Sequence, residues 1–332
     1  MKKAQLSLAV VVVGLMVGYL LGPKPAPPVL QVRLPELDSS LQALADSIAR
    51  AESEVLDLKP DNEARIIWAD SMHRPTPWSV VYLPGFTATY MEGEPTHREF
   101  AQRYGCNLYV ARWPGHGLDV PDKLLHYHPD SVLATAAHAI AVGKRLGEKV
   151  LVMSTSTGGT LSLFLAAHAP EAVDALIAFS PNIAIKSGSA SLLTKPWGLQ
   201  IARQMMGSKN RSFEADEEFK KYWYNSYRLE GLVQLQNLVE HTMLPETFAG
   251  VRQPLFLGYY YKNEEEQDEV VSVPAMLQMY EQISTPGPLK RKAAFANVAN
   301  HALASYVGSA DLPAVQNAIN DFAEGVLGWA PQ

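Results

Sequence analysis

Short apolar runs alternate with longer helical segments from Ile66 onward, and this alternation constrains the fold more than any other feature of the sequence. Such a rhythm is typical of a mostly parallel central β-sheet with helices on both faces. Near residues 185–250 it gives way to a helical stretch rich in aromatic residues, which predicts an inserted helical lid. The predicted fold class is therefore α/β. The expected strands are residues 64–69, 79–83, 108–111, 149–153, 175–179, 254–260 and 290–295.

Length and composition limit the possible functions. A chain of 332 residues with 47% hydrophobic residues can bury a large core. Its net charge of −6 leaves no basic stripe, so we expect no nucleic-acid partner. The single cysteine, Cys106, cannot form an intramolecular disulfide and is expected to be a small buried residue. His126, His128 and Asp130 have the spacing of a metal-site fragment, but no further histidine cluster completes it, so neither a metal nor a cofactor is expected.

The N-terminus carries an uncharged apolar run from Leu6 to Gly22, preceded by Lys2 and Lys3. The run is close to the roughly 20 residues that a helix needs to cross the hydrocarbon core of a bilayer. Residues 1–22 are therefore predicted to be a single-pass membrane anchor, and the positive-inside rule places the rest of the chain on the extracytoplasmic, periplasmic side. A signal peptide, with secretion after cleavage, is the alternative, although the residues after the run form a poor cleavage site.

Residues 23–63 are expected to link this anchor to the main domain, residues 64–332. The stretch from Gly22 to Pro28 is rich in proline and predicts a short, stiff spacer that lifts the body off the bilayer. From Leu34 to Val55 apolar residues recur in steps of three and four, which predicts an amphipathic helix. We expect this helix to lie against the main domain, and an oligomerising helix is the alternative.

The segment from Lys149 to His168 has the pattern of a nucleophile elbow, in which a strand, a sharp turn and a helix follow one another. Ser156 lies at the tip of the expected turn, in S-T-S-T-G-G. The strained turn requires small residues two positions before and after the serine. Gly158 meets the second requirement, and Ser154 stands where glycine is usual at the first. An ordinary strand-to-helix turn with capping hydroxyls is the alternative interpretation.

A nucleophilic serine needs a general base that is itself oriented by a third group. In this arrangement the chain order is serine, acid, histidine, and His301 lies just past the last expected strand. We therefore predict that His301 is the base for Ser156. Several carboxylates follow the strand at residues 254–260, and Asp268 is favoured because the valine pair in D-E-V-V would hold its loop in place. Glu266 and Glu269 remain alternatives.

The tetrahedral intermediate of such a reaction needs two backbone N–H donors, which form an oxyanion hole. Thr157, directly after the candidate nucleophile, is predicted to supply one. Phe86, in the L-P-G-F-T-A-T segment after the strand at residues 79–83, is predicted to supply the other. Gly85 lets this loop approach a substrate closely.

Five segments together resemble one branch of the α/β-hydrolase superfamily, which contains carboxylesterases, monoacylglycerol lipases and serine-aminopeptidase-like enzymes. They read L-P-G-F-T-A-T, R-W-P-G-H-G, S-T-S-T-G-G-T, D-E-V-V and N-H-A-L-A-S. The resemblance covers roughly Ile66 to Leu327 and implies an α/β-hydrolase fold, with a triad and an oxyanion hole at the five positions predicted above. Pro84 and Ser154 depart from the commonest pattern of this branch.

The resemblance also implies a serine hydrolase that cleaves carboxylic esters through an acyl-enzyme intermediate, with no cofactor. The predicted anchor and apolar lid favour a small-molecule acyl ester or a lipid-like substrate. Two alternatives remain open. One is an acyltransferase or peptidase with the same triad, and the other is a non-catalytic, membrane-tethered binding module that kept the fold.

Overall fold

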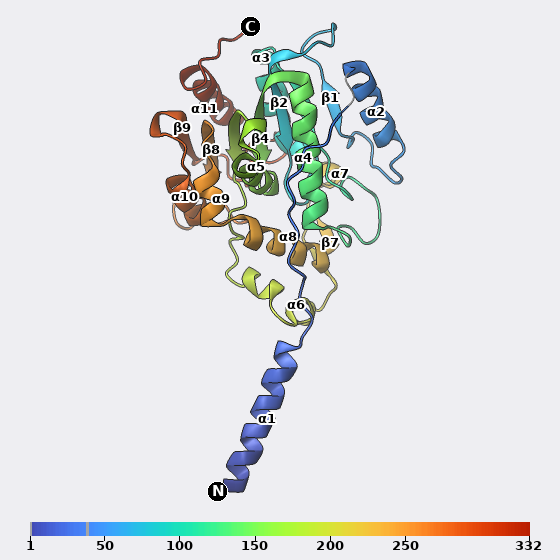
Figure 1. Ribbon diagram of the computed structural model, residues 1–332, viewed down its shortest axis with the longest axis vertical. Helices are drawn as coiled ribbons and strands as arrows, with labels where there is room; N and C mark the ends of the chain where they lie inside the picture. Colours follow the sequence, from blue (N-terminus) through green and yellow to red (C-terminus); the bar gives the residue numbers. More distant parts are fainter. Residues whose placement is uncertain (1, 38–39) are drawn as a thin grey trace.

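The computed structural model describes residues 2–37 and 40–332, with side chains except those of residues 2–4 and 6–11. Within this part of the chain, seven strands form one sheet in the order β1-β3-β2-β4-β5-β8-β9 (Figure 1). β1 pairs with β3 in the antiparallel direction, and all other neighbours are parallel. The expected α/β fold with a mostly parallel sheet is confirmed. The strands are β1 Arg65–Ile67, β2 Thr76–Leu83, β3 Asn107–Val110, β4 Gly147–Thr155, β5 Ala175–Phe179, β8 Leu255–Tyr260 and β9 Lys290–Phe295.

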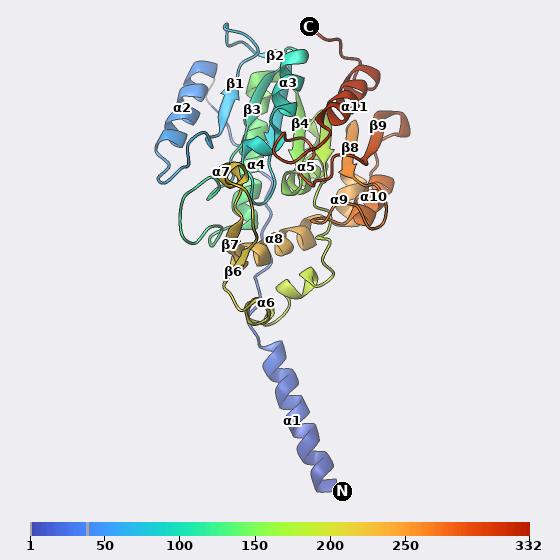
Figure 2. The ribbon, with the colours of Figure 1, turned by 180° about the vertical axis from the view of Figure 1, so that it is seen from behind.

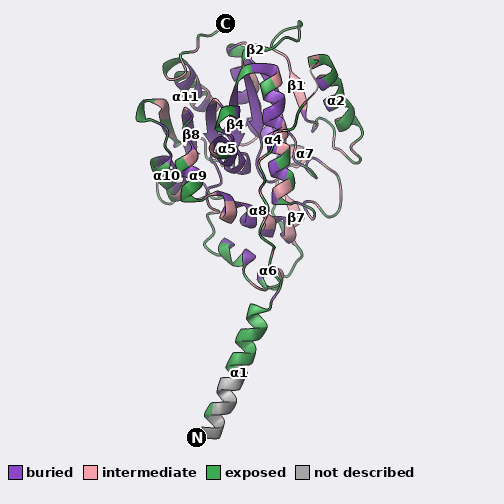
Figure 3. Cartoon of the chain, in the orientation of Figure 1, coloured by how far each residue is buried: buried purple, intermediate pink, exposed green. Residues whose placement is uncertain are grey.

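Helices cover both faces of the sheet, and the buried layers lie between helices and strands (Figures 2 and 3). Alternate strand residues face opposite sides, so Val81 packs in one core cluster and its neighbour Val80 in the other. The first cluster includes residues of α2 Leu41–Ser53, α4 Pro129–Leu146, α5 Thr157–His168, α8 Leu229–Thr242, α9 Pro245–Gly250 and α10 Val273–Gln282. The second includes residues of α3 Thr96–Arg103 and α11 Leu312–Gly325.

An insertion joins β5 to β8 and occupies the end of the body next to the N-terminal helix (Figures 1 and 2). It is largely helical and includes the range expected for the lid, residues 185–250. Its last helices, α8 and α9, pack into the first core cluster. Before them come α6 Gly198–Met206, α7 Glu217–Tyr222 and a small antiparallel sheet of β6 Asn210–Ser212 and β7 Ser226–Arg228.

Helix α1, Lys2–Leu20, extends away from the body in both views (Figures 1 and 2). Among the residues that the structure describes, no helix is both long enough and apolar enough to cross a membrane. Much of the predicted membrane-spanning run, residues 6–11, lies outside the residues whose side chains are described.

The residues after α1 lie against the body instead of lifting it away, contrary to the expected spacer. We call residues 21–37 the strap. The Pro23 carbonyl accepts a hydrogen bond from the Trp197 N–H at 2.9 Å. Farther along, the Asn237 amide donates to the Ala26 carbonyl at 2.8 Å, and the Leu30 N–H donates to Asp130 at 2.7 Å. Apolar strap side chains pack onto the first core cluster, which explains why this segment does not project into solvent: Leu30, Val32, Leu34 and Leu37.

The amphipathic helix predicted from Leu34 to Val55 is shorter than expected. It is α2, which spans Leu41–Ser53 and is capped by the Ser40 hydroxyl. Pro35 lacks an N–H and disfavours helical backbone at the residue before it, so the apolar spacing at the start of the run does not continue the helix. Leu44 and Ile48 of α2 are buried, so the helix lies against the main domain as predicted.

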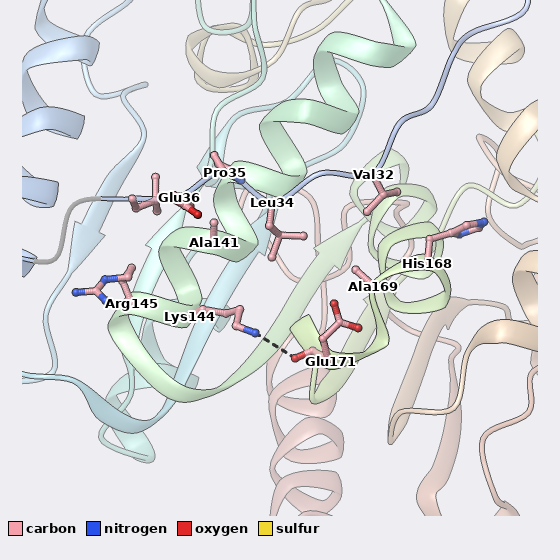
Figure 4. A pocket seen from close by; sticks show the side chains of 11 residues that line it. Val32, Leu34, Pro35, Glu36, Ala141, Lys144, Arg145, His168, Ala169 and Glu171 are labelled. Atoms are coloured by element: carbon pink, nitrogen blue, oxygen red, sulfur yellow. Dashed lines mark hydrogen bonds between the residues drawn. The ribbon is translucent and has the colours of Figure 1, made fainter.

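A cavity of about 660 Å³ lies between the strap and the ends of α4 and α5 (Figure 4). Lys144 of α4 spans part of it and donates to the Glu171 carbonyl at 3.2 Å. A second cavity, of about 450 Å³, lies beside α2. Neither cavity is lined by Ser156 or His301, so the candidate active site lies elsewhere.

Candidate active site

Ser156 forms the sharp turn between β4 and α5, with φ 53° and ψ −116°. Positive φ is uncommon for a residue with a side chain and marks a strained backbone that its surroundings must hold in place. The Ser156 N–H donates to the Phe179 carbonyl at 3.0 Å, and the Ser156 carbonyl accepts from the Asn182 N–H at 2.9 Å. Strand β5 and the residues after it therefore hold the strained turn that the nucleophile-elbow pattern predicts.

Small residues surround the turn for a reason that the structure makes explicit. A Cβ atom at Gly158 would lie 2.0 Å from the Leu83 carbonyl oxygen, so only glycine lets α5 start this close to the end of β2. On the other side, the Ser154 hydroxyl lies 3.1 Å from the Ser162 hydroxyl. Ser154 can replace the usual glycine because its hydroxyl has a buried hydrogen-bond partner on α5.

Replacing Gly158 with alanine is expected to destabilise the protein by about 1–3 kcal/mol, because overpacking forces the backbone to shift. Gly188 is a matched control, since a Cβ atom there meets nothing within 4 Å. Thermal unfolding of Gly158→Ala and Gly188→Ala should give a clearly lower Tm for the first alone. Equal Tm values would show that the turn tolerates a side chain.

Asp268 and His301 are in direct contact. His301 Nδ1 lies 2.7 Å from Asp268 Oδ2. The other oxygen, Asp268 Oδ1, accepts the N–H groups of Val270 and Val271 at 2.9 and 3.0 Å. Burial alone would raise the pKa of Asp268, but the His301 charge and these donors together hold it below its usual value. A carboxylate in this position can orient the imidazole and stabilise its protonated form.

The rival carboxylates in the same loop point elsewhere. Glu266 is exposed and pairs with Lys262 at 2.9 Å. Glu269 is also exposed, whereas the Asp268 side chain is fully buried. Asp268 is therefore the carboxylate of this loop that the structure brings to His301.

Ser156, Asp268 and His301 follow the C-terminal ends of the parallel strands β4, β8 and β9, which all lie at one edge of the sheet. Within the described residues, the Ser156 hydroxyl makes no hydrogen bond to His301. In enzymes without bound substrate, catalytic hydrogen bonds are often long and shorten only in the complex. The roles of Ser156, His301 and Asp268 as a catalytic triad therefore stay a prediction.

The two predicted oxyanion donors, the N–H groups of Phe86 and Thr157, have no acceptor among the described residues. Thr157 is the first residue of α5, so its N–H has no partner within the helix. The neighbouring peptide groups of the Phe86 loop are engaged: His116 Nε2 binds the Phe86 carbonyl, and the Gly85 N–H donates to Glu92. The loop is thus held while its Phe86 N–H stays available.

Glu92 is a residue of this site that sequence reasoning missed. Its side chain is buried beside the Phe86 loop, and burial raises its pKa to about 7, against the lowering effects of the His301 charge and the Gly85 N–H. Burial lowers the pKa of His301, but the charges of Asp268 and Glu92 reverse this and raise it. The sequence carried no signal that singles out Glu92, because Glu94 follows it two residues later in Y-M-E-G-E.

Aromatic residues of the insertion contact the oxyanion loop. The Tyr227 ring packs edge-on against Phe86, with ring centroids 5.4 Å apart. Tyr127, which precedes α4 and lies outside the insertion, does the same at 4.9 Å. Trp223 is buried and stacks on Phe219 at 4.9 Å. The insertion therefore supplies an aromatic wall to this side of the site.

No protein-family model and no curated protein matches the sequence. Solved structures do match. One, from work on the metagenome-derived lipolytic enzymes LipS and LipT, is 16% identical with a TM-score of 0.64 and covers 80% of this chain and 98% of its own. A monoacylglycerol lipase from Paleococcus ferrophilus is 15% identical with a TM-score of 0.54, covering 78% and 98%.

A third structure, Est1E from Butyrivibrio proteoclasticus with ferulic acid bound, is 15% identical with a TM-score of 0.52. It covers 80% of this chain and 95% of its own. Identities this low establish the shared architecture and nothing finer. The chain therefore has the α/β-hydrolase fold, in the arrangement that solved lipases and esterases share.

Proposed function

We propose that this protein is a serine hydrolase that cleaves carboxylic esters through an acyl-enzyme intermediate. The observation that carries the proposal is the direct contact between the buried Asp268 and His301, at the same edge of the sheet as the strained turn at Ser156. The fold it shares with lipases and esterases supports the same reaction class.

In the first step, Ser156 Oγ attacks the ester carbonyl carbon while its proton passes to His301 Nε2. Asp268 holds Nδ1 of the imidazolium that forms. The developing oxyanion accepts the N–H groups of Phe86 and Thr157, the carbon–oxygen bond to the alcohol breaks, and the imidazolium returns its proton to that alcohol. Water then attacks the acyl-enzyme by the same route, releasing the acid and restoring the serine.

The direct test is covalent. A fluorophosphonate probe reacts with an activated serine, and peptide mapping of the labelled protein is expected to find the adduct on Ser156. Hydrolysis of p-nitrophenyl esters over a range of acyl lengths should accompany the labelling. If the folded protein shows neither labelling nor turnover, the non-catalytic binding module becomes the better explanation.

Acyl esters or lipid-like esters are the proposed substrates. The aromatic contacts around Phe86 support an apolar acyl group, and the neighbours named above include a monoacylglycerol lipase and an esterase bound to ferulic acid. A peptidase with the same residues would depend on the free amine of its substrate, so blocking that amine separates the two activities.

We also propose that α1 attaches the protein to a membrane, with the main domain on the extracytoplasmic side. The exposed apolar side chains along the described part of α1, from Val12 to Leu20, support this location. Secretion after cleavage is the alternative. Alkaline carbonate extraction of cell membranes is expected to leave the protein in the pellet, and its release would contradict attachment through α1.

Glu92→Gln is expected to change the pH profile of the proposed reaction. The Glu92 charge raises the pKa of His301, so its removal should lower that pKa. Because His301 must be neutral to accept a proton, the acidic limb of kcat/KM should move to lower pH. The plateau should fall by about tenfold, less than for loss of an oxyanion donor, since the imidazolium loses one of two nearby anions.

A glutamine can still accept the Gly85 N–H, so this variant removes the charge of Glu92 but keeps its hydrogen bond to the Phe86 loop. The carboxylate also faces Trp223 and Tyr82, neither of which is charged near neutral pH. Glu94→Gln is the matched control, because Glu94 pairs with Arg98 at 2.8 Å. A profile unchanged in Glu92→Gln would mean that Glu92 acts only on the structure.

A further inference from the structure

Helix α6 and the residues around it present an unusually apolar surface to solvent. Six large apolar side chains are exposed there, and Met205 is the most exposed of them, at 80%: Leu192, Trp197, Ile201, Met205, Met206 and Phe213. We call these six residues, together with the cations described next, the α6 surface. Side chains of this size on one short stretch suit burial against an apolar partner.

The same stretch is strongly basic. Residues 185–213 contain five lysines and arginines and no acidic residue, in a chain whose net charge is −6. Arg203 pairs with Glu230, and the other four are exposed. These four are Lys186, Lys195, Lys209 and Arg211. An amphipathic element with an apolar face and lysines or arginines around it is typical of segments that lie in the interface of an anionic bilayer.

Contacts with Trp197 hold the end of α1 beside the α6 surface. Trp197, at the start of α6, donates its indole N–H to the Gly18 carbonyl at 3.1 Å and its backbone N–H to the Pro23 carbonyl. A Cβ atom at Gly22 would lie 2.1 Å from the Trp197 ring nitrogen, so the chain passes directly over that ring. α1 therefore leaves the body beside α6, as Figures 1 and 2 both show, and the strap keeps it there.

We propose that the α6 surface docks on an anionic lipid bilayer, with its apolar side chains in the interface and its cations at the headgroups. If α1 enters a bilayer, the hydrogen bonds to Trp197 bring α6 to the same interface. The inference rests on the proposed membrane location and is independent of the proposed catalysis. A second copy of this chain fits less well, because the exposed cations of two such surfaces would repel each other.

The test places an environment-sensitive dye on the α6 surface of the full chain. In Met205→Cys the introduced thiol is exposed, whereas Cys106 is 3% exposed and burial raises its pKa to about 12, so the dye reacts at position 205. Met72→Cys is the matched control, since Met72 is 62% exposed and lies between β1 and β2. Each labelled protein is reconstituted into vesicles of phosphatidylcholine alone or mixed equally with phosphatidylglycerol.

In mixed vesicles we expect the dye at position 205 to shift to the blue and to be quenched by brominated lipids, and the dye at position 72 to do neither. Adding Lys195→Gln and Lys209→Gln should lower the ratio of docked to undocked dye about 25-fold, because each cation at an anionic surface contributes about fivefold. Arg50→Gln with Arg252→Gln, which removes two exposed cations elsewhere, should leave that ratio unchanged.

Two results would overturn the proposal. In the first, vesicle flotation shows that the protein is bound while the dye at position 205 stays in water in both lipid mixtures. In the second, the blue shift appears without lipid and grows with protein concentration, which would identify a second copy as the occupant. Because the dye signal does not depend on turnover, each result keeps its meaning whether or not Ser156 proves to be catalytic.

Discussion

Ser156→Ala should reduce kcat for ester hydrolysis by about 10⁶-fold, the loss seen when a triad serine is removed elsewhere. The reason is that alanine has no hydroxyl that could attack the ester carbonyl and form the acyl-enzyme. The small remaining rate should come from the Phe86 and Thr157 N–H groups and from substrate binding. Alanine keeps the Cβ atom, so the turn at residue 156 carries the same backbone strain in both proteins.

Ser154→Gly is the matched control for this variant. It lies two residues away, changes a serine near the end of β4 and restores the residue that is usual at this position of the turn. It removes the hydroxyl that contacts Ser162, so a modest loss of stability is expected, of about 0.5–2 kcal/mol. Activity that survives in Ser156→Ala with an intact fold would exclude Ser156 as the nucleophile.

The sheet was predictable because its strands are short apolar runs separated by helical segments. All seven strands appear where these runs are, with differences of a few residues at the ends. The buried interior of each strand requires a run of apolar residues, which the sequence shows. The end of a strand depends on hydrogen bonds to neighbouring strands, which the sequence does not show. β4 continues to Thr155, for example, because it pairs with β5 up to that residue.

The N-terminal region was harder to predict. Proline-rich composition predicts a stiff, extended segment, and residues 23–37 form neither helix nor strand. The spacing of Leu30, Val32 and Leu34 is also that of an extended segment with one apolar side, but only the folded body shows the surface that they cover. The strap therefore follows from tertiary contacts, and local sequence patterns alone predicted a free spacer and part of a helix in its place.

In the candidate site, chain order and turn chemistry pointed to Ser156, His301 and Asp268 without any coordinates. The expected buried valine pair beside Asp268 is only half present, because Val271 is buried but Val270 is 50% exposed. The N–H groups of both valines, and not their side chains, contact the carboxylate. Glu92 was missed because its importance depends on lying near His301, which is over 200 residues away in the chain. Such a contact leaves no local pattern.

Asp268→Asn should lower kcat by about 10⁴-fold while the fold is kept, since an asparagine in place of the triad acid favours the wrong tautomer of the histidine. Removing this anion should also lower the pKa of His301, so the acidic limb of kcat/KM should move to lower pH.

Glu266→Gln and Glu269→Gln alter the two rival carboxylates of the same loop, and both are expected to keep near-normal rates. A large loss in either of these, with normal activity in Asp268→Asn, would move the acid to that residue. Equal and small losses in all three variants would mean that His301 works without a carboxylate from this loop, which would leave Glu92 as the other carboxylate whose charge raises the pKa of His301.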